Sequence, residues 1–190
     1  MYSSTENQMD KIVLITGASS GIGRGCAGKF ASEGARIILN SRSADKLESL
    51  AKELEDKYDA KCYVLPFDVR DRKAAAEALA SLPDEWKVID ILINNAGLAL
   101  GTDKEHEGCM EEWDVMIDTN IKALLSMTRI VVPGMLERGR GHIINIGSIA
   151  GDAAYPGGRD KGSSESLVRR IEDRPCGYSP SSDEYQTWPC

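Results

Sequence analysis

Small residues between Thr16 and Gly23 could bind the phosphates of a dinucleotide. Three glycines stand in the order Gly17-x3-Gly21-x-Gly23, directly after a short apolar stretch. Gly17 permits a tight turn, Gly21 lets the backbone approach a pyrophosphate, and Gly23 lets the following helix lie close to the sheet. The N-terminus of that helix would present free N–H groups and partial positive charge to the phosphates. The alternative for this stretch alone is an ordinary turn between a strand and a helix.

A basic residue after the second apolar stretch bears on which dinucleotide would bind. The predicted strand Ala35–Leu39 is followed by Asn-Ser-Arg-Ser at 40–43, with no acidic side chain. In nucleotide-binding α/β folds an acid at this strand end binds the 2′-hydroxyl of NAD, whereas an arginine accommodates the 2′-phosphate of NADP. Arg42 therefore favours NADP. The alternative is that Arg42 is a solvated surface charge.

Apolar and amphipathic stretches alternate along the chain and would position these side chains. Short apolar runs predict strands, and helical spacing of apolar residues predicts helices. The strands are predicted over Ile12–Ile15, Ala35–Leu39, Cys62–Phe67, Val88–Ile93 and His142–Ile146, and the helices over Ile22 to a Gly34 cap, Ala44–Tyr58, Arg72–Ser81 and Glu111–Arg129. This alternation predicts an α/β fold with a Rossmann-like doubly wound parallel sheet, whose ligands bind outside the carboxyl ends of the strands.

Composition restricts the classes of function. The net charge of −7 disfavours nucleic-acid binding. No run approaches the ~20 apolar residues of a membrane span, and the polar stretch Met1–Asp10 has no apolar signal core, so we expect a cytoplasmic protein with no membrane partner. The five cysteines are scattered without a C-x-x-C pair, and His106 and His142 are far apart, which predicts reduced thiols and no metal site.

Four motifs together resemble the short-chain dehydrogenase/reductase family. They are Thr-Gly-Ala-Ser-Ser-Gly-Ile-Gly at 16–23, Asn-Asn-Ala-Gly at 94–97, Asp-Thr-Asn at 118–120 and Ile-Asn-Ile-Gly-Ser-Ile-Ala-Gly at 144–151. The resemblance runs from about Lys11 to Gly158, and the stretches Leu98–Gly101 and Trp113–Asn120 are most similar to its NADP-dependent serine/3-hydroxy acid dehydrogenase branch. It implies an NADP-dependent oxidoreductase acting on a small hydroxy acid, alcohol or carbonyl substrate.

The resemblance also implies roles for individual residues. The cofactor-binding residues would be Gly17, Ser19, Ser20, Gly21, Ile22 and Gly23 at the pyrophosphate, Arg42 at the 2′-phosphate, Asp68 and Val69 at the adenine, and Asn95, Ala96 and Gly97 at the ribose. Ser148 would hydrogen-bond the substrate carbonyl oxygen, and Asn120 would hold a water of the proton relay. The alternatives are that Ser148 is a strand-end turn residue and that Asn120 is a buried polar residue satisfying backbone groups.

The catalytic Tyr-x-x-x-Lys pair of the family is missing at its expected place, about a dozen residues after Ser148. In the family the ammonium group lowers the pKa of the phenol, which transfers the proton. Position 161 is Lys and position 165 is Glu. Tyr155 has Arg159 four residues later, but the intervening Pro-Gly-Gly at 156–158 disfavours the helical turn that would stack them. The chain is therefore predicted to be catalytically impaired; the alternatives are a non-catalytic NADP-binding or interaction module and a non-functional truncated product.

The composition changes at Arg159, where charged residues, serines and prolines replace the periodic pattern. We predict a flexible N-terminus over 1–10, an incomplete NADP-binding Rossmann domain over 11–158 and a poorly ordered tail over 159–190. A reading frame shifted by one nucleotide could encode Ala-Thr-Lys-Ala at 159–162 and Thr-Asn-Ile-Arg-Pro-Gly-Leu-Val at 183–190, and both segments resemble the family. A frameshift is therefore one hypothesis for the tail, and a natural regulatory tail is the other.

The predicted sheet is truncated after about five strands, which has two consequences. An open apolar edge is expected where a sixth strand would pair, and such an edge favours aggregation. Members of the family form dimers or tetramers through the helix around Trp113–Arg129 and its neighbour. Because the tail replaces that neighbour, a homo-oligomer is doubtful for this chain.

Overall fold

The computed structural model describes residues 10–101 and 107–147. In chain order the elements are β1 (Ile12–Thr16), α1 (Gly21–Ser32), β2 (Arg36–Asn40), α2 (Ala44–Tyr58), β3 (Cys62–Val64), α3 (Arg72–Ala80), the 3-10 turn η1 (Asp84–Trp86), β4 (Ile89–Asn94), α4 (Met110–Ile117), the π-helical segment η2 (Asp118–Ala123), α5 (Leu124–Glu137) and β5 (His142–Asn145). Ser148, Tyr155, nearly all of the predicted N-terminal segment and the predicted tail lie outside the described residues.

The described strands form one parallel sheet in the order β3-β2-β1-β4-β5. Central strand β1 pairs with β2 and β4, so that Val13 lies opposite Ile37 on one side and Ile91 on the other. Each connection between strands that follow one another in the chain contains a helix, as parallel pairing requires. The predicted doubly wound Rossmann-like sheet is confirmed, and β5 is the edge of its described part.

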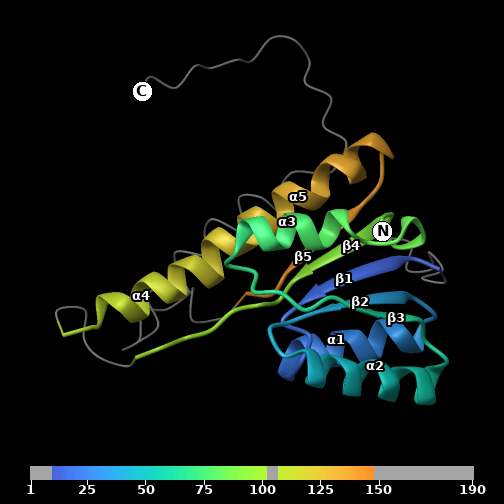
Figure 1. Ribbon diagram of the computed structural model, residues 1–190, viewed down its shortest axis with the longest axis horizontal. Coiled ribbons are helices and arrows are strands. Elements are labelled where there is room, and N and C mark those ends of the chain that lie inside the picture. Colours follow the sequence, from blue (N-terminus) through green and yellow to red (C-terminus); the bar gives the residue numbers. More distant parts are fainter. Residues whose placement is uncertain (1–9, 102–106, 148–190) are drawn as a thin grey trace, which may run out of the picture.

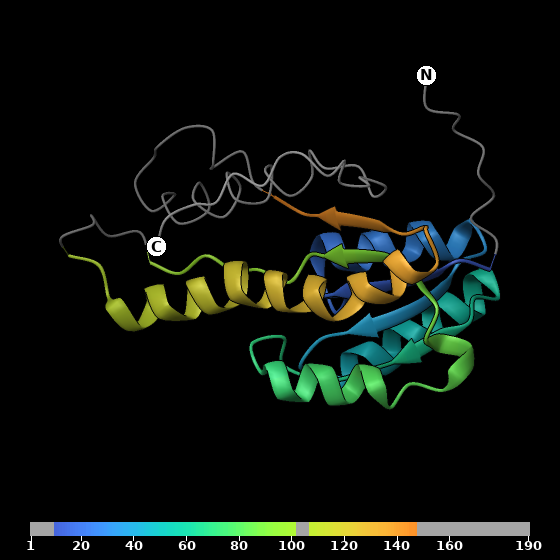
Figure 2. The same ribbon diagram turned by 90° about the horizontal axis from the view of Figure 1, so that it is seen from above.

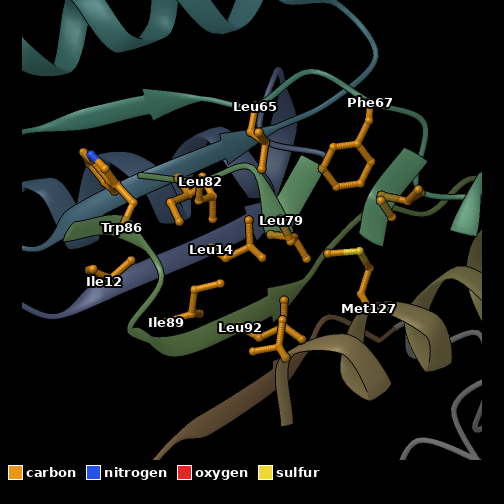
Figure 3. Close-up of a cluster of buried hydrophobic side chains, with 14 of the residues drawn as sticks. Ile12, Leu14, Leu65, Phe67, Leu79, Leu82, Trp86, Ile89, Leu92 and Met127 are labelled. Atoms are coloured by element: carbon orange, nitrogen blue, oxygen red, sulfur yellow. The ribbon is translucent and has the colours of Figure 1, made fainter. Parts of the chain in front are cut away.

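The two faces of the sheet carry separate apolar cores because successive side chains of a strand point to opposite faces. Ile12 and Leu14 pack toward α3 and α5, whereas Val13 and Ile15 pack toward α1 and α2. Figure 1 shows these helix pairs on opposite sides of the sheet. Figure 3 shows the first core, where side chains from the strands meet Leu79 of α3 and Met127 of α5. Burying one such side chain contributes about 1.5–3 kcal/mol, so the helices are held on both faces.

The third strand is shorter than predicted, ending at Val64 instead of Phe67. Pro66 has no N–H to continue the ladder, which explains the early end. Beyond Val64 the Asn40 side chain supplies hydrogen bonds in place of the strand ladder. Its Nδ2 donates to the carbonyl oxygens of Leu65 (3.0 Å) and Phe67 (3.2 Å). The segment is thereby held beside β2 without being a strand.

The helix predicted over Glu111–Arg129 is longer and not uniform. It begins at Met110, passes through the π-helical segment Asp118–Ala123 and continues to Glu137 with Pro133 inside it. Figure 2 shows this long helix crossing the sheet and extending past the strands at its α4 end. A buried stripe of Met127, Val131 and Met135 continues across the proline, so packing maintains the helix where the proline removes a hydrogen bond. None of the described helices is long and apolar enough to cross a membrane.

Candidate functional site

A cavity of about 590 Å³ lies at the carboxyl ends of β1, β2 and β4. The strand order turns between β1 and β4, which is where ligands bind in open α/β sheets. In Figure 2 the arrowheads of β4 and β5 point toward the end of the molecule from which α4 projects. The walls include Asn120 and all the predicted cofactor residues except Gly23, namely Gly17, Ser19, Ser20, Gly21, Ile22, Arg42, Asp68, Val69, Asn95, Ala96 and Gly97. The structure therefore gathers residues that are more than a hundred positions apart into one site.

The glycine loop has the backbone that the sequence predicts. Gly17 has φ +65° and Gly21 has φ +55°, both in the region that favours glycine. A Cβ on Gly17 would lie 2.9 Å from the Ala96 Cα, whereas a Cβ on Gly21 would meet nothing within 4 Å. Gly17 is thus required for packing between two strand ends. The space beside Gly21 is open, as a loop that admits a pyrophosphate needs.

Gly23 lies behind the cavity wall instead of in it. A Cβ there would clash with the carbonyl oxygen of Gly17 and would lie 2.5 Å from the Asn95 Nδ2 atom. Gly23 therefore lets helix α1 approach the loop and the end of β4. This agrees with the predicted close approach of the helix, and Gly23 is not among the residues that line the cavity.

Thr16 links the loop to the end of β4. Its buried hydroxyl donates to the Ile93 carbonyl oxygen (3.2 Å) and accepts from the backbone N–H groups of Asn95 and Ala96 (3.0 Å each). The Asn95 Nδ2 atom in turn donates to the carbonyl oxygens of Thr16 (3.0 Å) and Gly17 (3.1 Å). Two of the predicted motifs are therefore fastened to each other at the floor of the cavity.

Cations and one carboxylate line the far end of the cavity, near the ends of β2 and β3. Arg42 is exposed and has no ion-pair partner within the described part of the chain. Asp68 is bound by the Arg70 guanidinium, with the Nε–Oδ1 distance 3.0 Å and the Nη2–Oδ2 distance 2.6 Å. These hydrogen bonds hold the pKa of Asp68 below its usual value, and the charge of Arg42 acts in the same direction. Lys46 adds a further cation.

Asn120 lies on the opposite wall, in the π-helical segment. Its Oδ1 accepts from the Leu98 N–H (2.9 Å), and its Nδ2 donates to the Leu98 carbonyl oxygen (2.8 Å). A Cβ on Gly97 would lie 3.2 Å from the same Oδ1 atom, so the segment after β4 lies tightly against this amide. The side chain thus satisfies backbone groups of the segment after β4, and its role in a proton relay stays a prediction.

Several residues of the site were not singled out by sequence reasoning. Thr16 belongs to a recognised motif, but its role depends on β4 lying beside β1. Asn40, which is fully buried, has an Oδ1 atom without a partner among the described residues, and Arg70 follows Asp68 by only two positions. A polar residue at the end of an apolar strand was the available signal for Asn40. Arg70 gave no signal of its own.

The donor set does not suggest a metal. No three side chains of His, Cys, Asp or Glu in the described ranges gather closely enough to hold an ion. Cys26, Cys62 and Cys109 are free thiols. The chemistry of the cavity is therefore that of backbone amides, hydroxyls and cations, which suits a phosphorylated organic ligand.

Known proteins resemble this chain over most of its length. The sequence profile described as short chain dehydrogenase matches residues 11–167. The NADP-dependent 3-hydroxy acid dehydrogenase YdfG of Escherichia coli K12 is 49% identical over 160 residues, which are 84% of this chain and 63% of that protein. The chain thus spans less than two thirds of the length of this curated relative.

Solved structures agree with the sequence relatives. A crystal structure of serine dehydrogenase from Escherichia coli is 49% identical and superimposes with a TM-score of 0.78, covering 84% of this chain and 72% of that one. A closed form of serine dehydrogenase complexed with NADP+ is 48% identical with a TM-score of 0.77, covering 84% of this chain and 63% of that one. The described fold is thus shared with solved dehydrogenase structures over most of this chain.

Proposed function

Because this chain belongs to the short-chain dehydrogenase family, we propose that it binds NADP in the cavity at the carboxyl ends of β1, β2 and β4. The observation that carries the proposal is Arg42, which lines the cavity without an ion-pair partner among the described residues, while residues 40–43 contain no acid. An unpaired guanidinium at this strand end suits a 2′-phosphate, whereas NAD would need a carboxylate. The names of the relatives, which specify NADP, support the same cofactor.

Each predicted residue has a place in this proposal. The loop around Gly21, with Ser19, Ser20 and Ile22, would face the pyrophosphate, and the N-terminus of α1 would add its partial charge. Val69 and Asp68 would border the adenine, and residues 95–97 the ribose. Gly23 would act by letting α1 approach. Bound NADP supplies a hydride acceptor or donor at its nicotinamide ring, and this chain's residues orient it.

The reaction that we propose for the family architecture is oxidation of a small hydroxy acid or alcohol, or reduction of the corresponding carbonyl compound. Ser148 would orient the substrate oxygen. No Tyr-x-x-x-Lys sequence occurs anywhere in the 190 residues, so the chain lacks the family's usual proton donor and the cation that tunes it. We therefore propose that the chain binds cofactor but turns substrate over poorly.

A second candidate is a non-catalytic NADP-binding module. The bonds of Asn120 to Leu98 favour it, because they commit both polar atoms of this side-chain amide to the backbone of the cavity wall. Cytoplasmic location, the lack of nucleic-acid partners and the doubtful homo-oligomer stay predictions from the sequence.

One experiment distinguishes the candidates. NADPH binding to the full chain is followed by the change in nicotinamide fluorescence, and NADPH oxidation is measured with small 3-oxo acids and aldehydes. We expect saturable binding with turnover far below that of the full-length relatives. Turnover comparable to theirs would contradict the proposed impairment, and absence of binding would contradict the cofactor assignment.

A further inference from the structure

We propose that Arg70 determines the selectivity of this site for NADP over NAD by neutralising Asp68, so that the charge of Arg42 stays available to the 2′-phosphate. The inference rests on the proposed NADP binding and adds to it a residue acting at a distance from the phosphate. Arg70 thus acts through Asp68 and is not itself a ligand of the phosphate.

The geometry around Asp68 carries this inference. The Asp68 carboxylate lies in the same cavity wall as Arg42 and Arg70, and both cations act on its charge. Arg70 binds it with two of its three side-chain nitrogens, Nε to Oδ1 at 3.0 Å and Nη2 to Oδ2 at 2.6 Å, and with its backbone N–H to Oδ1 at 3.0 Å. Because the two side chains keep only 34% and 30% of their surface exposed, the pair is partly shielded from solvent.

The pairing decides which cation stays free. Without Arg70, the full negative charge of Asp68 would act on Arg42 and on any phosphate that approached it. Each unit charge interacts by roughly 1 kcal/mol at 4 Å even in water, and more where solvent is partly excluded. A 2′-phosphate carries negative charge that a 2′-hydroxyl lacks. An uncompensated Asp68 would therefore penalise NADPH much more than NADH.

The other carboxylates near Arg70 are already engaged. Asp118, whose charge also acts on Arg70, is bound by Lys122 with an Nζ–Oδ1 distance of 2.7 Å. Asp71 caps helix α3 and accepts from the N–H groups at positions 73 and 74, both at 3.0 Å. Of these three carboxylates, Asp68 is the one whose charge is neutralised by Arg70.

The test measures the ratio of the dissociation constants for NADH and NADPH, using the full chain at low ionic strength. The variants are R70Q, D68N and the double variant D68N/R70Q. R72Q is the matched control. It removes the same charge two residues away, at an exposed arginine that does not line the cavity. Thermal unfolding of each variant checks that it is folded.

We expect R70Q to lower the selectivity ratio by about fivefold through weaker NADPH binding, the scale of one partly exposed charge interaction. D68N/R70Q should restore the ratio to that of the unmodified chain, and D68N alone should keep or raise it. R72Q should leave it unchanged. If R70Q does not fold, D68N decides, because a fall in its ratio contradicts the inference.

Three results would overturn the inference. R70Q could weaken NADPH and NADH equally, which indicates a merely structural role. R70Q could leave the ratio unchanged. The double variant could stay as unselective as R70Q, which indicates that Arg70 contacts the phosphate itself. Each of these requires that the unmodified chain binds NADPH, whereas a chain that binds neither dinucleotide refutes the proposed function and this inference with it.

Discussion

Replacing Thr16 by valine should destabilise the protein and loosen the cavity floor. Valine keeps the shape of threonine but removes the hydroxyl group. Thr16 is 2% exposed, and its hydroxyl donates one hydrogen bond and accepts two. The Asn95 N–H keeps a second acceptor, the Ile93 carbonyl oxygen at 3.1 Å. The Ala96 N–H has no other acceptor within the described residues, so it is the group left unsatisfied.

The unsatisfied Ala96 N–H sets most of the loss in unfolding free energy. An unsatisfied N–H costs about 1–3 kcal/mol, toward the lower end here because Ala96 is half-buried. Loss of the longer bond to Ile93 adds about 0.5 kcal/mol, so T16V should lose about 2 kcal/mol of unfolding free energy. The assay is urea unfolding of the full chain. The matched control is T16S, which keeps the hydroxyl and loses the methyl group, at a cost of about 1 kcal/mol.

Cofactor binding separates this mechanism from a simple loss of packing. The hydroxyl of Thr16 fastens residues 95 and 96 to the glycine loop, so T16V should weaken NADPH binding while T16S should not. If T16V is as stable as the unmodified chain, or if T16S weakens NADPH binding more than T16V does, the hydroxyl does not hold the two motifs together and the reasoning is wrong.

Three further predictions concern single positions. G23A should destabilise the chain by about 1–3 kcal/mol in urea unfolding because a Cβ there meets backbone, whereas G25A, whose Cβ meets nothing within 4 Å, should stabilise helix α1 by about 0.5–1 kcal/mol. The Arg70 guanidinium lowers the pKa of the Asp68 carboxylate in the folded chain. The ionised carboxylate therefore stabilises the folded chain at pH values above its pKa in the unfolded chain, and this contribution is lost as the pH falls through its pKa in the folded chain. The difference in unfolding free energy between the unmodified chain and D68N should therefore shrink below about pH 4. Burial raises the pKa of the Cys62 thiol to about 11, so peptide-resolved mass spectrometry at pH 8 should show much slower alkylation of Cys62 than of the exposed Cys109. Equal rates would contradict the burial of Cys62.

The strands and helices could be predicted wherever local pattern decides them. The helix Ala44–Tyr58 agrees at both ends because its apolar positions repeat at helical spacing and no proline interrupts them. The predicted third strand is too long because the apolar run continues to Phe67, whereas Pro66 cannot donate to the ladder. The last long helix continues eight residues past its predicted end at Arg129, because the buried face through Met127 and Val131 carries it across Pro133.

The site could be predicted where a residue's role depends on its own backbone. Gly17 and Gly21 need positive φ, and that requirement is visible in the loop sequence. The partners that a side chain meets on another element were not predicted. Asn40 is bound to the segment after β3, and the engagement of Asn120 with Leu98 exists because the helix and the end of β4 meet. No local pattern encodes such contacts.

Asp68 shows how this difference matters for function. From the sequence it is a carboxylate at a strand end, and the family resemblance places it at the adenine. In the structure both of its oxygens accept hydrogen bonds from Arg70, so the unit that borders the cavity is a neutral pair. A neutral pair leaves Arg42 and Lys46 as the charges that a ligand meets there. The preference for a phosphorylated ribose then depends on Asp68 and Arg70 as well as on Arg42. The selectivity of such a site depends on how the carboxylate is compensated as much as on the presence of the arginine.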